Sequence, residues 1–264
     1  MDLKVTAIQS ELHWENVDEN LKMFSEKIVA IPEQTDIVVL PEMFNTGFSM
    51  KSEELSETMS GKAVSWMLEM SKKAKAVIVG SLIIKEENEF YNRLVWVQPN
   101  GEINTYDKRH LFRMADEHSH FNAGSDRIII EYKGWKICPL VCYDLRFPVW
   151  SRNTSDNQYD VLIYIANWPA ARKAPWSKLL EARAIENQCY VVGVNRVGED
   201  GKGFAYSGNS AIINPKGEPI SSIPEHENIT ATVKISLDDL NTFRKVFPVG
   251  MDADEFKITH SQSS

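Results

Sequence analysis

Hydrophobic and polar residues alternate over residues 3–9, and this period of two predicts a strand with one buried face. The apolar residues that follow recur at spacings of four, three and four, which predicts one face of an amphipathic helix that ends before Pro32. They are Val17, Leu21, Phe24 and Ile28. A short apolar strand at 37–40, a helix at 61–73 and a buried strand at 76–84 then repeat this order.

Turn residues divide the rest of the chain. Asn100 and Gly101 tolerate a positive φ, so residues 99–101 predict a hairpin turn between strands at 90–98 and 102–106. Further predicted elements are strands at 127–132, 135–141, 160–166, 190–195 and 229–234, turns at 133–134 and 214–217, and helices at 176–188 and after Ser236. Strands that alternate with helices, with hairpins inserted among them, predict large mixed sheets covered by helices. This is an α/β fold other than a βαβ barrel.

The composition is that of one globular domain. Of the 264 residues, 43% are hydrophobic and 25% are charged, and large α/β layers reach this length as a single unit. No linker, internal repeat or low-complexity tract divides the sequence, so we predict a single domain over residues 1–264. Residues 252–264 lack periodicity and are predicted to form a C-terminal extension that packs on a neighbour or frays.

The charge pattern argues against nucleic-acid and membrane partners. The net charge is −8, the pI is near 5.4 and no dense run of Lys and Arg is present, whereas such partners usually require a basic face. No apolar run approaches the roughly 20 residues that a membrane span needs. The first ten residues lack the pattern of a secretory signal, and three cysteines fit reduced thiols. We therefore predict a cytoplasmic protein.

Two charged residues stand at the ends of predicted strands. Glu42 comes directly after Pro41, which closes the apolar run at 37–40, and Lys108 follows the hairpin strand at 102–106. A lone carboxylate in such a place is commonly a solvated loop residue, and a lone lysine is commonly a surface charge. Each residue taken alone therefore leaves its function open.

A cysteine follows the predicted strand at 135–141. Cys142 stands at the start of a predicted helical turn near Pro148. A thiol at a junction from strand to helix lies near free backbone N–H groups and a helix dipole, which favour the thiolate. A buried structural cysteine is the more common fate of a lone Cys, so that interpretation also stays open. Cys138 lies four residues earlier, which excludes a CxxC redox pair.

Together, these three stretches resemble the nitrilase, or carbon–nitrogen hydrolase, superfamily. Its pattern is a Glu after an early strand, a Lys before a His-Leu-Phe-like run and a Cys within a Cys-Tyr-Asp-Leu-Arg-Phe-Pro-like run. The chain has these residues in the same order, at Glu42, Lys108 and Cys142. The resemblance covers nearly the whole chain, including residues 183–188 and the turn at 214–217. It implies a four-layer αββα sandwich and a homodimer that pairs through helices.

The resemblance also implies a Glu-Lys-Cys triad that hydrolyses amides. Cys142 supplies the nucleophile, and Glu42 moves the thiol proton to the departing ammonia and then activates water. Lys108 and the backbone N–H of Tyr143 hold the oxyanion. A fourth polar residue, Glu117, orients Lys108 and the substrate amide.

Glu117 is assigned by its offset from Gly124, although the family often has Gly where this chain has Asp116. No step of the implied reaction uses a metal ion or a cofactor. Three histidines stand in this part of the chain without further ligands at a metal-like spacing, so we predict surface or hydrogen-bonded histidines. They are His110, His118 and His120.

Three segments resemble the ω-amidase branch of the superfamily: residues 42–49, residues 108–115 and Asn167-Trp168-Pro169 with Arg172 after it. Enzymes of that branch deamidate 2-oxoglutaramate and 2-oxosuccinamate, so the implied substrate is a small amide with a free carboxylate. An N-carbamoyl-amine hydrolase or a nitrilase uses the same triad on another substrate. A papain-like Cys–His hydrolase and a catalytically silent binding protein also stay open.

A substrate carboxylate requires a cation away from the reacting carbon. Lys108 serves the oxyanion, so Arg172 is the first candidate, because its planar guanidinium suits bidentate carboxylate binding. Arg113 follows Lys108 by five residues and is the competing candidate. The other predicted substrate-binding residues are Tyr143, Trp168 and Phe44.

Overall fold

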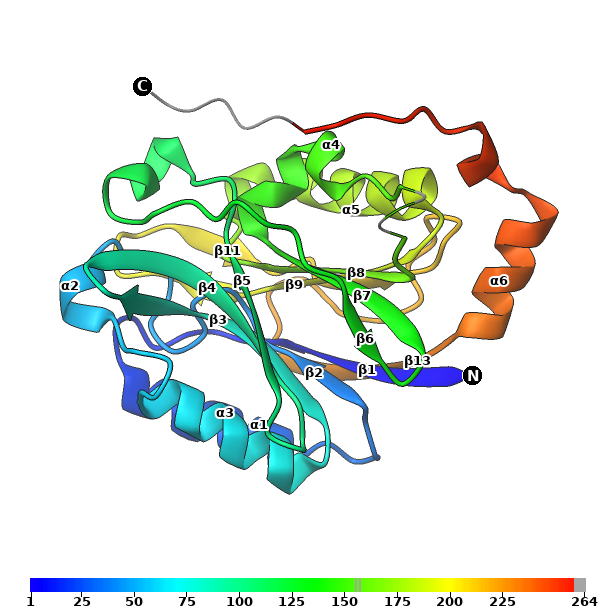
Figure 1. Cartoon of the computed structure of the whole chain (residues 1–264). Coiled ribbons are helices and arrows are strands. Elements are labelled where there is room, and N and C mark those ends of the chain that lie inside the picture. Colours follow the sequence, from blue (N-terminus) through cyan, green and yellow to red (C-terminus); the bar gives the residue numbers. More distant parts are fainter. Residues whose placement is uncertain (155, 157, 259–264) are drawn as a thin grey trace.

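Two β-sheets packed face to face form the centre of the molecule, and helices cover the outer face of each (Figure 1). The computed structural model describes residues 1–154, 156 and 158–258. Its layer order is helices, sheet, sheet and helices. The predicted mixed sheets and the four-layer αββα sandwich implied by the resemblance are both confirmed.

The larger sheet has six strands in the order β13-β1-β2-β3-β4-β5. They are β1 (Asp2–Gln9), β2 (Ile37–Val39), β3 (Val77–Glu86), β4 (Glu89–Val97), β5 (Ile103–Asp107) and β13 (Ile229–Ser236). β1, β2 and β3 are parallel, and the remaining pairs are antiparallel. β2 is buried on both faces, which explains why its sequence is a continuous apolar run.

The smaller sheet has five strands in the order β12-β9-β8-β7-β6. They are β6 (Ile130–Tyr132), β7 (Trp135–Val141), β8 (Val161–Ala166), β9 (Tyr190–Asn195) and β12 (Ala211–Ile213). β7, β8 and β9 are parallel. A separate two-stranded hairpin, β10 (Val197–Glu199) with β11 (Ala205–Ser207), follows β9.

Helices α1 (Val17–Val29) and α3 (Lys62–Ala74) cover the six-stranded sheet, and α4 (Pro148–Ser151) and α5 (Lys173–Asn187) cover the other (Figure 1). The remaining helices are α2 (Ser52–Leu55) and α6 (Leu237–Val246). Short 3-10 turns are η1 (Arg113–Ala115), η2 (Glu117–Ser119), η3 (Cys142–Arg146), η4 (Ala170–Arg172) and η5 (Val249–Asp252). Within the described residues, no helix is both long and apolar enough to cross a membrane.

The hydrophobic core lies between the two sheets and extends under α5. Fully buried side chains from both sheets meet there, among them Val79, Trp96, Leu140 and Ile163. Gly193 in β9 allows α5 to approach closely, because a Cβ at this position would lie 2.5 Å from Leu180. A second core fills the space between the six-stranded sheet and α1 and α3.

Each long predicted strand and helix is present, and the differences lie at the ends. The three predicted hairpin turns each contain a glycine at positive φ: Gly101, Gly134 and Gly217. The helix predicted from 176 begins at Lys173, because a proline is tolerated in the first turn of a helix. The strand predicted from 127 begins at Ile130, where pairing with β7 starts.

The predicted C-terminal extension begins within η5. Residues 253–258 are exposed and have no regular secondary structure, and the part of this prediction at 259–264 lies outside the described residues. The segment runs along the outside of α4 and α5 (Figure 1).

Candidate active site

The ends of four strands bring polar side chains together between the two sheets. Glu42 follows β2 and Lys108 follows β5 in the larger sheet, whereas Cys142 follows β7 and Asn167 follows β8 in the smaller sheet. The carboxyl ends of strands in such layers converge at one edge, which is where α/β proteins usually bind ligands. Glu117 joins the group from η2.

Lys108 lies between two carboxylates in the interior. Its Nζ is 2.9 Å from Oε1 of Glu42 and 2.9 Å from both oxygens of Glu117. All three side chains are buried, with relative exposures of 1% or less. The two carboxylates raise the pKa of Lys108 and outweigh the effect of burial, so the amine stays protonated.

Two buried carboxylates face a single ammonium, so neutral donors must stabilise the remaining negative charge. The side-chain Nδ2 of Asn92 donates to Glu42 at 2.8 Å and to Glu117 at 3.2 Å. The backbone N–H of Asn167 donates to Glu42 at 2.8 Å, and that of Phe112 donates to Glu117 at 2.5 Å. Burial and the nearby Glu42 nevertheless raise the pKa of Glu117, and Lys108 opposes this shift.

Asn92 is not among the residues predicted from the sequence. It occupies a fully buried position within β4, in the run Glu89–Val97. A polar side chain in a strand is a signal for such a residue, because buried polar groups require hydrogen-bond partners. The signal is weak here, since Arg93 beside it is also polar.

Cys142 occupies a strained backbone position at the start of η3. Its φ of 43° lies in the left-handed region, which non-glycine residues rarely adopt and which is common at functional sites. Its Sγ lies 4.0 Å from the carbonyl oxygen of Asn167. The next residue, Tyr143, has a backbone N–H within the first turn of η3, where such groups lack partners inside the turn.

The resting state of Cys142 differs from the expectation that its position favours the thiolate. Burial and the negative charge of Glu42 raise the pKa of the Cys142 thiol well above its ordinary value, although Lys108 acts in the opposite direction. The five-residue 3-10 turn is too short to offset this effect with its dipole. Cys142 is therefore a neutral thiol, and a base must deprotonate it during attack.

A cavity of about 430 Å³ opens onto the thiol. Three of the predicted substrate-binding residues line it: Tyr143, Trp168 and Arg172. Phe48, Phe112, Met114, Phe204 and Tyr206 supply apolar and aromatic wall. The volume suits a small molecule.

Two arginines on the cavity wall flank Trp168. The Arg146 guanidinium lies 5.0 Å from the Trp168 ring centroid, and the Arg172 guanidinium lies 5.3 Å from the ring of Phe112. The indole N–H of Trp168 donates to the carbonyl oxygen of Arg172 at 2.7 Å. Among the described residues, neither guanidinium has a carboxylate within 4.0 Å, so both are available to an anion. Arg146 is not among the predicted substrate-binding residues, yet it lines the cavity.

Two predicted substrate-binding residues lie elsewhere. Phe44 is fully buried in the core under α1 and α3, where its ring contacts Phe24 and Trp66 at centroid distances of 5.6 and 5.5 Å. The chain reverses at Met43, whose φ is 43°, so Glu42 reaches the site and Phe44 enters the core. Arg113 also lies away from the cavity wall. It is exposed and does not line the cavity, because η1 turns the neighbouring side chains of Met114 and Ala115 toward it instead.

The predicted histidines make local contacts. His110 Nδ1 lies 2.8 Å from Asp144, while His118 and His120 lie near Asp116 at 3.7 and 4.0 Å. Over residues 1–154, 156 and 158–258, no group of three or more His, Cys, Asp or Glu side chains is arranged to hold a metal ion.

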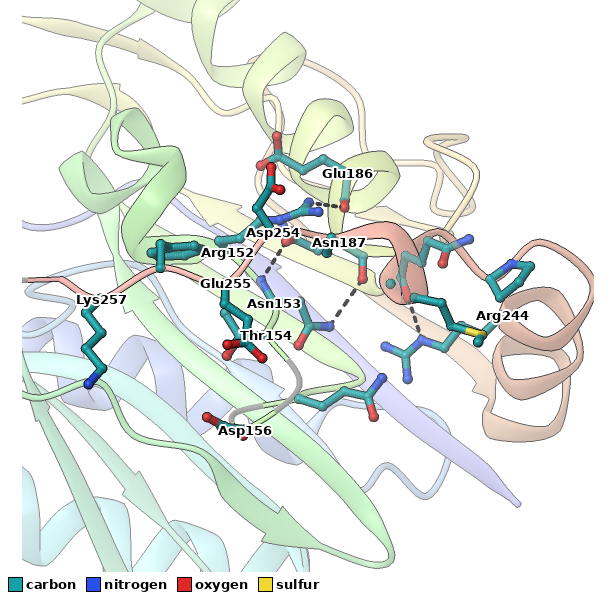
Figure 2. Close-up of a pocket in the computed structure, with 17 residues that line it drawn as sticks. Arg152, Asn153, Thr154, Asp156, Glu186, Asn187, Arg244, Asp254, Glu255 and Lys257 are labelled. Atoms are coloured by element: carbon teal, nitrogen blue, oxygen red, sulfur yellow. Dashed lines mark hydrogen bonds between the residues drawn. The ribbon is translucent and has the colours of Figure 1, made fainter.

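A larger cavity of about 1020 Å³ lies between the C-terminal segment and the body of the protein (Figure 2). Its walls contain both polar and apolar side chains and none of the predicted site residues. Two of its arginines have partners in the fold: Arg152 donates to the carbonyl of Glu186, and Arg244 pairs with Asp160 at 2.7 Å. Because none of the described residues that line it is a cysteine, this cavity is not the candidate active site.

Sequence comparison finds known proteins that are similar to this chain over nearly its whole length. The chain is 47% identical over 256 residues to Omega-amidase YafV of Escherichia coli (strain K12), a match that covers 97% of this chain and 98% of that protein. It is 32% identical to the 2-oxoglutaramate amidase of Bacillus subtilis (strain 168), over 94% and 96% of the two chains.

A solved structure has the same fold. XC1258 from Xanthomonas campestris, a CN-hydrolase superfamily protein with an arsenic adduct in its active site, superimposes with a TM-score of 0.95. It is 40% identical, and the match covers 98% of this chain and 100% of that one. The family model for carbon–nitrogen hydrolases matches residues 4–245. The chain therefore belongs to the carbon–nitrogen hydrolase family.

Proposed function

We propose that the protein is an ω-amidase, a thiol amidohydrolase that releases ammonia from the terminal amide of small 2-oxo-dicarboxylic monoamides such as 2-oxoglutaramate and 2-oxosuccinamate. The observation that carries this proposal is one cavity with Cys142 in its wall and Arg146 and Arg172 facing the same space. The names of two relatives, an omega-amidase and a 2-oxoglutaramate amidase, support this substrate class.

The acylation step uses Glu42 as the base and Cys142 as the nucleophile. Glu42 accepts the thiol proton while the sulfur attacks the amide carbon, and the carbonyl electron pair moves onto oxygen. The resulting oxyanion is held by Lys108 and the N–H of Tyr143. Glu42 then protonates the amide nitrogen, the C–N bond breaks, and ammonia leaves a thioester.

Hydrolysis of the thioester reverses these roles. Glu42 accepts a proton from water as the water oxygen attacks the thioester carbon. The C–S bond then breaks, and the proton returns from Glu42 to the sulfur of Cys142. The products are a dicarboxylic acid and ammonia, and the enzyme is restored without an external acid or base.

The contacts of Lys108 suit an oxyanion donor. An ammonium carries three N–H groups. One N–H group donates to Glu42, and a second is shared by both oxygens of Glu117. The third N–H group is left for the substrate oxygen. Because Glu117 and Glu42 fix the amine on two sides, its orientation is set before the substrate binds. Donors of this kind typically contribute about 2.7–4 kcal/mol to transition-state stabilisation.

The distal end of the substrate meets the two arginines. A monoamide of a dicarboxylic acid carries its free carboxylate at the opposite end from the reacting carbon. Arg146 and Arg172 lie in the same cavity as Cys142 and lack carboxylate partners among the described residues, so they suit this anion. The aromatic walls limit the cavity to a short chain.

Ammonia release across a panel of amides tests the proposal. The panel contains 2-oxoglutaramate, an uncharged amide of similar length, an N-carbamoyl amine and a nitrile. We expect the highest kcat/KM with 2-oxoglutaramate and no turnover by Cys142→Ala. A preference for the N-carbamoyl amine or the nitrile would replace the proposed substrate, and turnover by Cys142→Ala would remove the mechanism.

Two further variants test the assigned roles. Glu42→Gln and Lys108→Ala should each abolish turnover in a folded protein. The double variant should be little worse than either single one, because residues that act as a unit do not have additive effects.

Changing each of the six histidines tests the papain-like alternative, which requires a His partner for the thiol.

We also propose that the whole chain is one catalytic domain. We further propose that the protein is a homodimer that associates through α4, α5 and the C-terminal extension. Large apolar side chains are exposed on this side of the molecule: Val149, Ile185, Val246, Phe247 and Met251. Such a concentration of exposed apolar side chains is unusual on a monomer. The cytoplasmic location stays a prediction from the sequence.

A further inference from the structure

The proposed catalytic groups come from two different sheets. Lys108 follows β5 in the six-stranded sheet, and Cys142 follows β7 in the five-stranded sheet. Most of the contact between the sheets is apolar packing, which is non-directional. The hydrogen bond from the backbone N–H of Asn167 to Glu42 joins the sheets at the site, but it involves neither Lys108 nor Cys142. A shift of about 1 Å between reacting groups can cost a hundredfold in rate. Directional contacts between the segments of Lys108 and Cys142 would limit such a shift.

Asp144 provides contacts of this kind. Its Oδ2 accepts the backbone N–H of Val141, the last residue of β7, at 3.0 Å, and the hydroxyl of Tyr106, from the opposite sheet, at 2.8 Å. Its Oδ1 accepts the backbone N–H of His110 at 3.0 Å and lies 2.8 Å from His110 Nδ1. The carboxylate is fully buried, so these contacts are not exchanged for water.

The two partners of Asp144 stand on either side of Lys108, two residues before it and two residues after it. Tyr106 is held in turn by the indole N–H of Trp150, which donates to its hydroxyl at 3.0 Å. The His110 ring stacks on Phe147, with centroids 3.6 Å apart and planes within 6°. Both contacts reach residues that follow Cys142 in sequence, so the two segments are joined at several points.

We propose that Asp144 is a positioning residue, which fixes Lys108 relative to Cys142 through its hydrogen bonds to Tyr106 and His110. This inference rests on the catalytic roles assigned under the proposed function. Asp144 does not line the cavity, so it acts on the reaction only through these neighbours.

The variant Asp144→Asn tests the inference with almost no change of shape. Whichever way the side-chain amide of the variant turns, its NH2 group faces a backbone N–H donor, that of Val141 or that of His110. At least one hydrogen bond is therefore lost. We expect kcat to fall about ten- to a hundredfold and KM for the best substrate of the panel to change less than about threefold, because positioning affects the chemical step.

Asp160→Asn is the matched control. Asp160 is also a buried carboxylate that joins two segments, since it accepts the backbone N–H of Lys136 at 3.0 Å and pairs with Arg244 at 2.7 Å. It lies outside the cavity wall. Thermal unfolding should show a comparable loss of stability in both variants, while Asp160→Asn keeps the wild-type kcat. An equal loss of kcat in both variants would mean that Asp144 serves only the fold.

Two substitutions of His110, one of which keeps a hydrogen-bond donor, provide a second measurement. His110→Ala removes the side-chain contact with Asp144, whereas the amide of His110→Asn can still donate to it. We expect the Asn variant to recover at least about fivefold in kcat over the Ala variant at equal thermal stability, because one directional bond is restored. Equal kcat values in the two variants would overturn the role of this contact.

Failure of the proposed function and failure of this inference give different results. If the wild type prefers another member of the substrate panel, the substrate proposal fails and the same kcat comparison is made with that compound. If the wild type turns over none, the alkylation rate of Cys142 by iodoacetamide replaces kcat. A rate in Asp144→Asn within threefold of the wild type would then contradict the positioning role.

Discussion

At the scale of single residues, the proposed chemistry depends on three charges and one thiol that share a buried site. Lys108 neutralises part of the charge of Glu42 and Glu117, and N–H donors stabilise the remainder. Burial and the same carboxylates raise the pKa of Cys142 and favour its protonated form. In the proposed mechanism, attack by the sulfur is therefore accompanied by proton transfer to Glu42.

This coupling predicts a pH dependence of alkylation. Because the folded-state pKa of Cys142 is raised, its thiolate fraction should keep increasing above about pH 9, where an ordinary thiol with a pKa of about 8.5 levels off. Lys108→Ala removes a positive charge that lowers this pKa, so it should slow alkylation further at a given pH. The measurement is the rate of iodoacetamide labelling of Cys142 by mass spectrometry from neutral to alkaline pH.

Cys138 and Cys189 serve as internal references in the same experiment. Both are fully buried, and burial raises the pKa of Cys138 to about 12. We expect Cys142 to be labelled first because it lines the cavity. A labelling rate for Cys142 that levels off below about pH 8.5 would contradict the protonated resting state.

The two cavity arginines give a prediction about specificity. Arg146→Ala and Arg172→Ala should each lower kcat/KM for 2-oxoglutaramate roughly ten- to a hundredfold, the equivalent of a charged hydrogen bond of about 1.5–3 kcal/mol. An uncharged amide of similar length should lose much less. Arg113→Ala is the matched control, because this arginine is exposed and outside the cavity. Equal losses for both substrates would show that neither arginine binds the carboxylate.

At the scale of elements, the site depends on where the strands end. Lys108 leaves β5 beside a loop that returns past it, and the backbone N–H of Gly124 donates to the carbonyl of Lys108 at 3.0 Å. A Cβ on Gly124 would lie 2.2 Å from the carbonyl oxygen of Asp107, a contact that no side chain can make. The absence of a side chain at Gly124 is thus required for this close approach to the end of β5.

Gly124→Ala should therefore displace the end of β5. Overpacking of this kind typically costs about 1–3 kcal/mol, and kcat should fall as well, because Lys108 moves with the strand end. Urea unfolding and steady-state kinetics measure the two effects. In Gly250→Ala, where a Cβ would meet no atom within 4 Å, both quantities should stay at wild-type values. If Gly124→Ala also stays at those values, the close approach does not position Lys108.

At the scale of the whole molecule, one side carries the apolar surface on which the dimer proposal depends. Phe247 and Met251 have relative exposures of 59% and 84%, and Ile185 on α5 has 55%. The C-terminal segment crosses this side, and the larger cavity lies beneath it (Figure 2). A second copy of the chain would cover both features.

Light scattering tests this assembly. We expect a mass of twice the 30.1 kDa of one chain. Phe247→Glu combined with Met251→Glu should give a monomer, because burying a charge in an apolar interface is unfavourable. Val29→Glu is the control, since Val29 has the same exposure of 59% but lies on α1, on the opposite outer layer. A monomeric wild type would reject the proposal.

The sequence by itself determined the order of strands and helices and was enough to nominate the proposed catalytic residues. Both are local properties: periods of two and 3.6 are set by neighbouring side chains, and glycine turns require a positive φ at one position. Glu42, Lys108 and Cys142 were identifiable because each follows a predicted strand within a family motif. The αββα layers came from the family resemblance, since periodicity does not show which strands pair.

The tertiary structure alone decided which side chains share the cavity. Asn92 and Arg146 enter the site, whereas Phe44 and Arg113 lie outside it. For Phe44 the reason is the turn at Met43, which directs the ring into the core. The protonation of Cys142 likewise depends on burial and on charges far away in sequence, so no local pattern contains it. Contacts between the two sheets fix these features, and they exist only in the folded chain.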